Sequence, residues 1–156
     1  MLKQLSSLFM RPKPEATSSA AIGECVVELI RYVDSIKTHL GKSRFDSETT
    51  EKQSLSIYCF GAVSVLAQQK GISPIEAKAI YVAILMKSFA YDQKSSEFKA
   101  DAIISAVGDK TSFLYPTIHR GIDGFVAWQS RQDDSAAQDF SEIVAHLLKK
   151  QSERKK

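Results

Sequence analysis

The sequence contains no asparagine and little glycine or proline. Of its 156 residues, 7 are glycine and 4 are proline. Without asparagine there is no N-glycosylation acceptor and no Asn-Gly turn, the strongest short signal of a β-hairpin. These absences favour a helical fold over one built from hairpins.

Cysteine is also scarce, and long apolar runs are missing. Cys25 and Cys59 are the only cysteines, and both lie in apolar stretches without a CxxC pair, which predicts buried free thiols rather than a disulfide. No run of about 20 uninterrupted apolar residues could span a bilayer, and the N-terminal apolar run is too broken for a signal peptide. We therefore expect a cytoplasmic protein that is neither secreted by that route nor integral to a membrane.

Motifs that carry catalysis or metal binding are absent too. The sequence has no HExxH, GxSxG or GxGxxG motif, and no Glu-x-x-His pair of the kind that binds metals in helical bundles. Glu142 and His146 are four residues apart, a spacing more typical of an exposed ion pair on a helix than of a metal site. We expect no catalytic residue, no cofactor and no bound metal.

What the sequence does contain is apolar residues at helical spacing, which predict one compact all-α domain of about six helices over residues 18–150. Gly41 and Gly71 are natural helix ends. Ser73, Pro74 and Glu76 form a capping box with proline at the first helical position. The two most apolar helices, near residues 50–70 and 74–90, are expected at the centre. The predicted helices cover residues 22–40, 50–70, 74–90, 96–107, 116–131 and 134–150.

Both ends of the chain are basic and are expected to lie outside this domain. Residues 1–17 combine an amphipathic segment with a proline-containing linker, and residues 151–156 form a basic tail. The segment could contact an anionic membrane weakly, at the inner face, as an alternative function. Nucleic acid is not an expected partner, because the tail has no interleaved aromatic residues and the body is acidic. The apolar residues of the segment are Leu2, Leu5, Leu8 and Phe9.

The stretch YPTIHRGIDGF, residues 115–125, is the most unusual part of the sequence. On the predicted helix, His119 and Asp123 are four residues apart and should touch. Gly121 and Gly124 each cost about 0.5 to 1 kcal/mol relative to alanine inside a helix, a penalty that suggests a compensating close contact. The contact could come from a neighbouring helix of the chain or from an external partner.

The function best supported by these patterns is that of a non-enzymatic interaction or regulatory module, bacterial in its size, whose partner is a protein. The rival interpretation is a small-ligand binder or enzyme with a pocket near His119. A homo-oligomer stays open, because the two central helices are very apolar, although burial within one domain explains them equally well. Aromatic and arginine residues favour interfaces, and the expected interface residues are Tyr115, His119, Arg120, Asp123 and Trp128.

Overall fold

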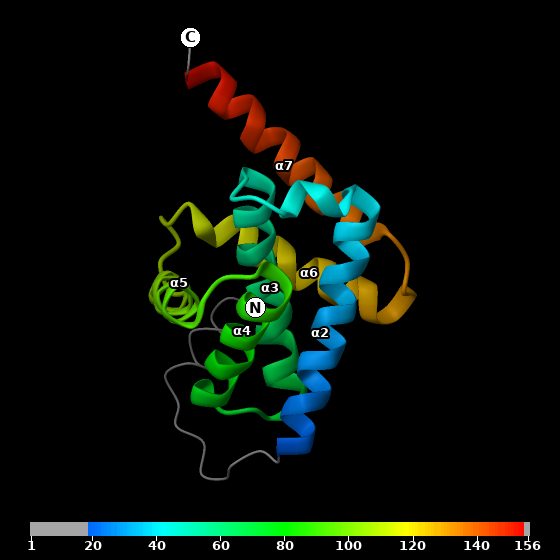
Figure 1. Cartoon of the computed structure of the whole chain (residues 1–156), viewed down its shortest axis with the longest axis vertical. Coiled ribbons are helices and arrows are strands. Elements are labelled where there is room, and N and C mark those ends of the chain that lie inside the picture. The colour runs from blue at the N-terminus through cyan, green and yellow to red at the C-terminus, as the bar shows by residue number, and fades with distance from the viewer. Residues whose placement is uncertain (1–18, 155–156) are drawn as a thin grey trace.

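The computed structural model describes residues 19–154, and it confirms the all-α prediction. This part of the chain contains six α-helices, one short 3-10 helix and no strand (Figure 1). The elements are α2 (Ser19–Leu40), η1 (Lys42–Phe45), α3 (Thr50–Lys70), α4 (Pro74–Phe89), α5 (Gln93–Ala106), α6 (Leu114–Arg131) and α7 (Ser135–Arg154).

Helix α3 is the centre of the fold. Every residue from 58 to 67 is buried, and α3 contacts α2, α4, α6 and α7, with α6 as its most extensive neighbour. Figure 1 shows α3 in the middle of the molecule with the other helices around it. Helix α4 is less central, because it buries one side through Ile80, Tyr81 and Ile84 while Ile75 stays exposed.

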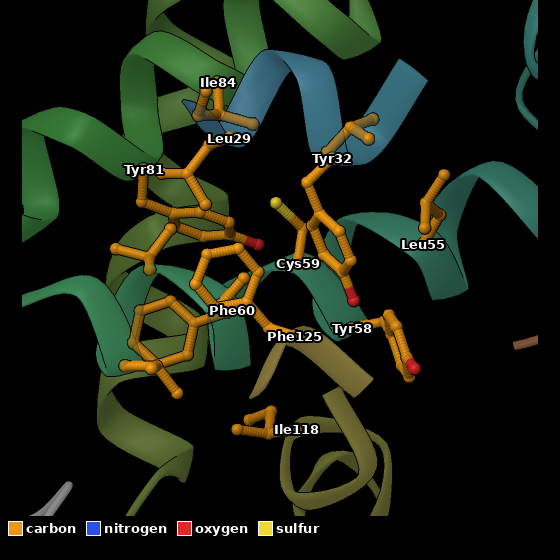
Figure 2. Packing of buried hydrophobic residues seen from close by; sticks show 14 of the residues in the cluster. Leu29, Tyr32, Leu55, Tyr58, Cys59, Phe60, Tyr81, Ile84, Ile118 and Phe125 are labelled. Atoms are coloured by element: carbon orange, nitrogen blue, oxygen red, sulfur yellow. The ribbon is translucent and has the colours of Figure 1, made fainter. Parts of the chain in front are cut away.

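Aromatic rings join the helices of the core (Figure 2). Tyr32 of α2 meets Phe125 of α6 edge to face, with ring centroids 4.9 Å apart. Phe60 of α3 meets Tyr81 of α4 in the same way at 5.0 Å. Such pairs contribute about 0.5 to 1.5 kcal/mol beyond the burial of their area. The central helices are therefore fixed relative to one another by ring geometry as well as by apolar burial.

The capping signals in the sequence form the contacts expected of them. Gly41 and Gly71 follow α2 and α3 with φ angles of 106° and 65°, which glycine adopts without strain. The Ser73 hydroxyl accepts a hydrogen bond from the Glu76 N–H at 3.3 Å and donates one to the Glu76 carboxylate at 2.6 Å. The start of α4 is thus confirmed.

Several helix ends differ from the prediction, among them the start of α2, which lies at Ser19 rather than at residue 22. Helix α5 begins at Gln93, three residues early, because the Asp92 carboxylate accepts a hydrogen bond from the Ser95 N–H at 2.7 Å and caps the helix there. Helix α6 begins at Leu114, two residues before residue 116, and Pro116 lies in its first turn. Helix α7 continues through Arg154, beyond residue 150.

Both cysteines are buried free thiols, as the sequence predicts. Burial raises the pKa of Cys59 to about 12 and also raises the pKa of Cys25, where nearby Lys70 partly offsets the effect. Because the thiolate is the reactive form, we expect neither thiol to react with a disulfide reagent in the folded protein at mildly alkaline pH, and both to react in denaturant. Rapid labelling of the folded protein would contradict the burial described here.

Candidate partner-binding surfaces

The stretch singled out in the sequence lies on α6, whose sides have different roles. Ile118, Ile122 and Phe125 are buried in the core, whereas His119 and Asp123 are exposed. The helical spacing of three and four residues separates these two sets. Helix α6 therefore buries one apolar side and presents a polar one.

The two glycines of α6 face α3 of the same chain. A Cβ atom at Gly121 would lie 2.1 Å from the Tyr58 carbonyl oxygen, and one at Gly61 would lie 2.5 Å from the Ile118 carbonyl oxygen. The α3 and α6 backbones thus touch directly, with a glycine on each side. A Cβ at Gly124 would lie 1.9 Å from the Tyr58 hydroxyl. The close contact that the glycines require is intramolecular.

An ion-pair network connects α6 to α7 beside this crossing. The Arg120 guanidinium pairs with the Asp139 carboxylate and lies 3.6 Å from the Glu142 carboxylate. The Tyr58 hydroxyl donates a hydrogen bond to Asp139 Oδ2 at 3.0 Å. Asp139 thereby links a buried tyrosine of α3 to a half-exposed arginine of α6.

A shallow hollow of about 250 Å³ lies over this network. Burial and the nearby Asp139 carboxylate raise the pKa of Tyr58, and burial raises the pKa of Tyr32 well above its usual range. Both hydroxyls therefore stay protonated at neutral pH, as the hydrogen bond that Tyr58 donates to Asp139 requires. The hollow is lined by Arg120, Asp123, Gly124, Ala127, Ser135, Ala136 and Asp139.

His119 has the surroundings of an exposed helical pair. Its Nε2 lies 3.9 Å from Asp123 Oδ2, so the predicted proximity is present, but the distance is too long for a hydrogen bond. His119 is not among the residues that line the hollow. His119 is thus an exposed side chain outside the lining of this hollow.

The five residues predicted for the interface divide into three groups. His119, Arg120 and Asp123 lie within two turns on the outward side of α6. Tyr115 is half-buried and packs against the core. Trp128 is only 4% exposed, so its prediction as an exposed anchor is wrong. Its ring lies 5.3 Å from that of Tyr32, and it contributes to the core instead.

Sequence reasoning missed a groove of about 600 Å³ beside α5 and the start of α6. Phe98 is one of the apolar residues of the helix predicted over 96–107, but it is 76% exposed, and Phe113 is 86% exposed. Ser96 and Ala100 are buried instead, and Phe98 is about 200° around the helix from each. The row of small residues formed by Ser96 and Ala100 is the sequence signal that marks the buried side of α5. The groove is lined by Gln53, Ser56, Ile57, Lys94, Ser95, Phe98, Lys99, Ala102, Ile103, Phe113 and Leu114.

Two other expectations bear on ligands and membranes. Within residues 19–154, no group of three or more His, Cys, Asp or Glu side chains is placed to bind a metal ion. No helix in that range is long and apolar enough to cross a membrane. The predicted membrane contact through Leu2, Leu5, Leu8 and Phe9 lies outside the described residues.

A family model described as immunity protein 48 matches residues 22–148, which spans the helices from α2 into α7. No curated protein and no solved structure matches the chain.

Proposed function

Because the chain belongs to the immunity protein 48 family, we propose that it binds a partner toxin protein and blocks the activity of that toxin. The family match over residues 22–148 is the observation that carries the proposal. Protein binding also agrees with the polar side of α6, where His119 and Asp123 are exposed. On this proposal the protein confers immunity by binding the toxin and not by catalysing a reaction.

The α6–α7 surface, defined by Arg120, Asp123, Asp139 and Glu142, offers a charged contact for the toxin. Its three carboxylates outnumber its single guanidinium, so the surface favours a basic region of the partner. Complementary charges chiefly increase the rate and specificity of association. The planar guanidinium of Arg120 adds several hydrogen-bond donors to this surface. The Asp139 carboxylate already orients it.

Co-expression tests the function directly. Candidate toxins are the products of genes adjacent to the gene of this protein. We expect the full chain to restore growth to cells that express the correct toxin domain, and to form a complex with it that survives size-exclusion chromatography. Cells that die despite a folded, abundant full-length chain, together with the absence of a complex for every adjacent toxin domain, would contradict the proposal.

Replacing Arg120 with alanine tests the α6–α7 surface. We expect the affinity for the toxin domain to fall at least tenfold, about 1.4 kcal/mol, because the neighbouring carboxylates lose their orienting cation and the partner loses a donor. Arg131→Ala is the matched control, since Arg131 is an exposed arginine at the end of the same helix. Titration calorimetry of both variants, with melting curves to verify folding, makes the comparison. An affinity left unchanged by Arg120→Ala would remove the α6–α7 surface from the interface.

A further inference from the structure

The groove described above exposes two phenylalanine side chains that nothing in the described chain covers. Phe98 comes from α5, and Phe113 immediately precedes α6, so the two rings extend from different elements into the lining of one hollow. Between them lie apolar side chains, among them Ile57 and Leu114. Single exposed apolar residues are ordinary, but a grouped apolar surface marks a binding site.

The chain on either side of Phe113 is held in place. The Asp109 carboxylate accepts hydrogen bonds from the Thr111 N–H at 3.0 Å and the Thr111 hydroxyl at 2.6 Å. The Ser112 hydroxyl then accepts one from the Leu114 N–H at 3.2 Å. Phe113 is thus presented from an ordered turn, which lowers the entropy cost of using it in an interface.

The basic side chains of α5 line the groove and its acidic side chains do not, so the groove is basic. Lys94 and Lys99 line it, and no carboxylate does. The acidic residues of α5 lie elsewhere: Asp101 pairs with Lys78 of α4 at 2.7 Å, and Glu97 accepts a hydrogen bond from Gln93. One helix therefore presents lysines to the groove while its acidic side chains pair outside it.

We propose that this groove binds an apolar segment of the partner toxin that is flanked by acidic residues. The inference rests on the proposed function and adds a second, separate contact to it. The two phenylalanines supply the apolar anchors, and Lys94 and Lys99 pair with the flanking carboxylates. Helix α5 lies at the side of the molecule opposite α2 (Figure 1), so its outer side is open to a large partner.

Charge argues against the two other occupants that the chain itself could supply. The segment before residue 18 carries Lys3, Arg11 and Lys13 against one carboxylate, Glu15, so it would bring like charge to the lysines of the groove. A second copy docked symmetrically would bring Lys94 and Lys99 towards their own counterparts. Like charges in contact disfavour a complex, whereas an acidic segment of the toxin brings opposite charge to Lys94 and to Lys99, whose ammonium also lies 4.6 Å from the Tyr91 ring centroid.

Affinity measurements with the toxin domain test the groove. In the full chain, the double substitution Phe98→Ala and Phe113→Ala is expected to weaken binding at least about 30-fold, as for central aromatic anchors. Ile75→Ala and Val27→Ala are the controls, because these side chains are 83% and 59% exposed but lie on α4 and α2. They should change the affinity by less than about twofold, as expected for residues outside an interface.

Charge reversal and cross-linking identify the occupant. Lys94→Glu with Lys99→Glu should weaken binding and reduce its dependence on salt, whereas Lys87→Glu on the exposed side of α4 should not. A photo-reactive benzoylphenylalanine in place of Phe113 should cross-link to an acidic segment of the toxin. Cross-links to a second copy or to residues 1–17 would overturn the proposal.

The failures of the two proposals are distinguishable. If the wild-type chain binds the toxin and the double phenylalanine variant binds it equally well, the groove proposal is overturned and the immunity function stands. If the wild-type chain binds no adjacent toxin domain, the immunity function fails, and the proposed occupant of the groove fails with it.

Discussion

Replacing Gly121 with alanine is expected to lower the free energy of unfolding by about 3 kcal/mol or more, the upper part of the range for overpacked cores. The new methyl group would lie 2.1 Å from the Tyr58 carbonyl oxygen and 2.9 Å from its carbonyl carbon. Both atoms belong to the backbone of α3, so no side chain can rotate away. The helices must separate, and urea denaturation measured by circular dichroism would record the loss.

Gly23→Ala is the matched control, because Gly23 also lies inside a helix but has nothing within 4 Å of a Cβ atom. It should stabilise the protein by about 0.5 to 1 kcal/mol, through helix propensity alone. Gly61→Ala should destabilise as Gly121→Ala does, since it contacts the same crossing from α3. If the Gly121 and Gly23 variants were equally stable, α3 and α6 could not be in backbone contact.

Trp128→Ala is expected to lower the free energy of unfolding by about 3 to 5 kcal/mol, as for other buried aromatic residues. The indole stacks on Phe125 at 5.8 Å between ring centroids. The Arg31 guanidinium of α2 lies 6.0 Å from the centroid of the Trp128 ring. Alanine would leave a cavity between α2 and α6. Trp128→Phe retains an aromatic ring and should lower the free energy of unfolding by less. Denaturation curves of the two variants would establish the difference.

The same variant distinguishes a core role from an interface role. Measured at a temperature where Trp128→Ala is still folded, the affinity for a protein partner should stay within about threefold of the wild type, since the ring is not at the surface. A variant of unchanged stability that loses its partner would restore Trp128 as an interface anchor and contradict its buried position.

Most of the helix boundaries could be predicted because local chemistry determines them. Gly41, Gly71 and Ser73 end or begin helices through contacts within a few residues, and such contacts can be recognised in sequence. The cap at Asp92 is harder to recognise, because the polar stretch around it has no apolar period.

Tertiary placement was harder to predict. The i, i+4 spacing predicts that His119 and Asp123 lie close together. The free-energy cost of a glycine inside a helix predicts a close contact at Gly121. Neither pattern could say that the contact comes from Tyr58, which is 63 positions earlier in the chain. Trp128 is buried although it was expected at an interface, and Phe98 is exposed although it belongs to the apolar residues of its helix. Burial depends on which helix lies opposite, and the apolar period of a single helix does not contain that information.

The direct contact between the α3 and α6 backbones has a kinetic consequence for any partner. Helix α6 has no layer of side chains beneath Gly121 that could compress or change rotamer, so it cannot move towards α3 when pressed from outside. At the α6–α7 surface proposed above, a partner would therefore meet the outward side of α6 in the geometry that it already has. Association at that surface would need no prior rearrangement of this helix, so diffusion, orientation and long-range electrostatic attraction would govern its rate.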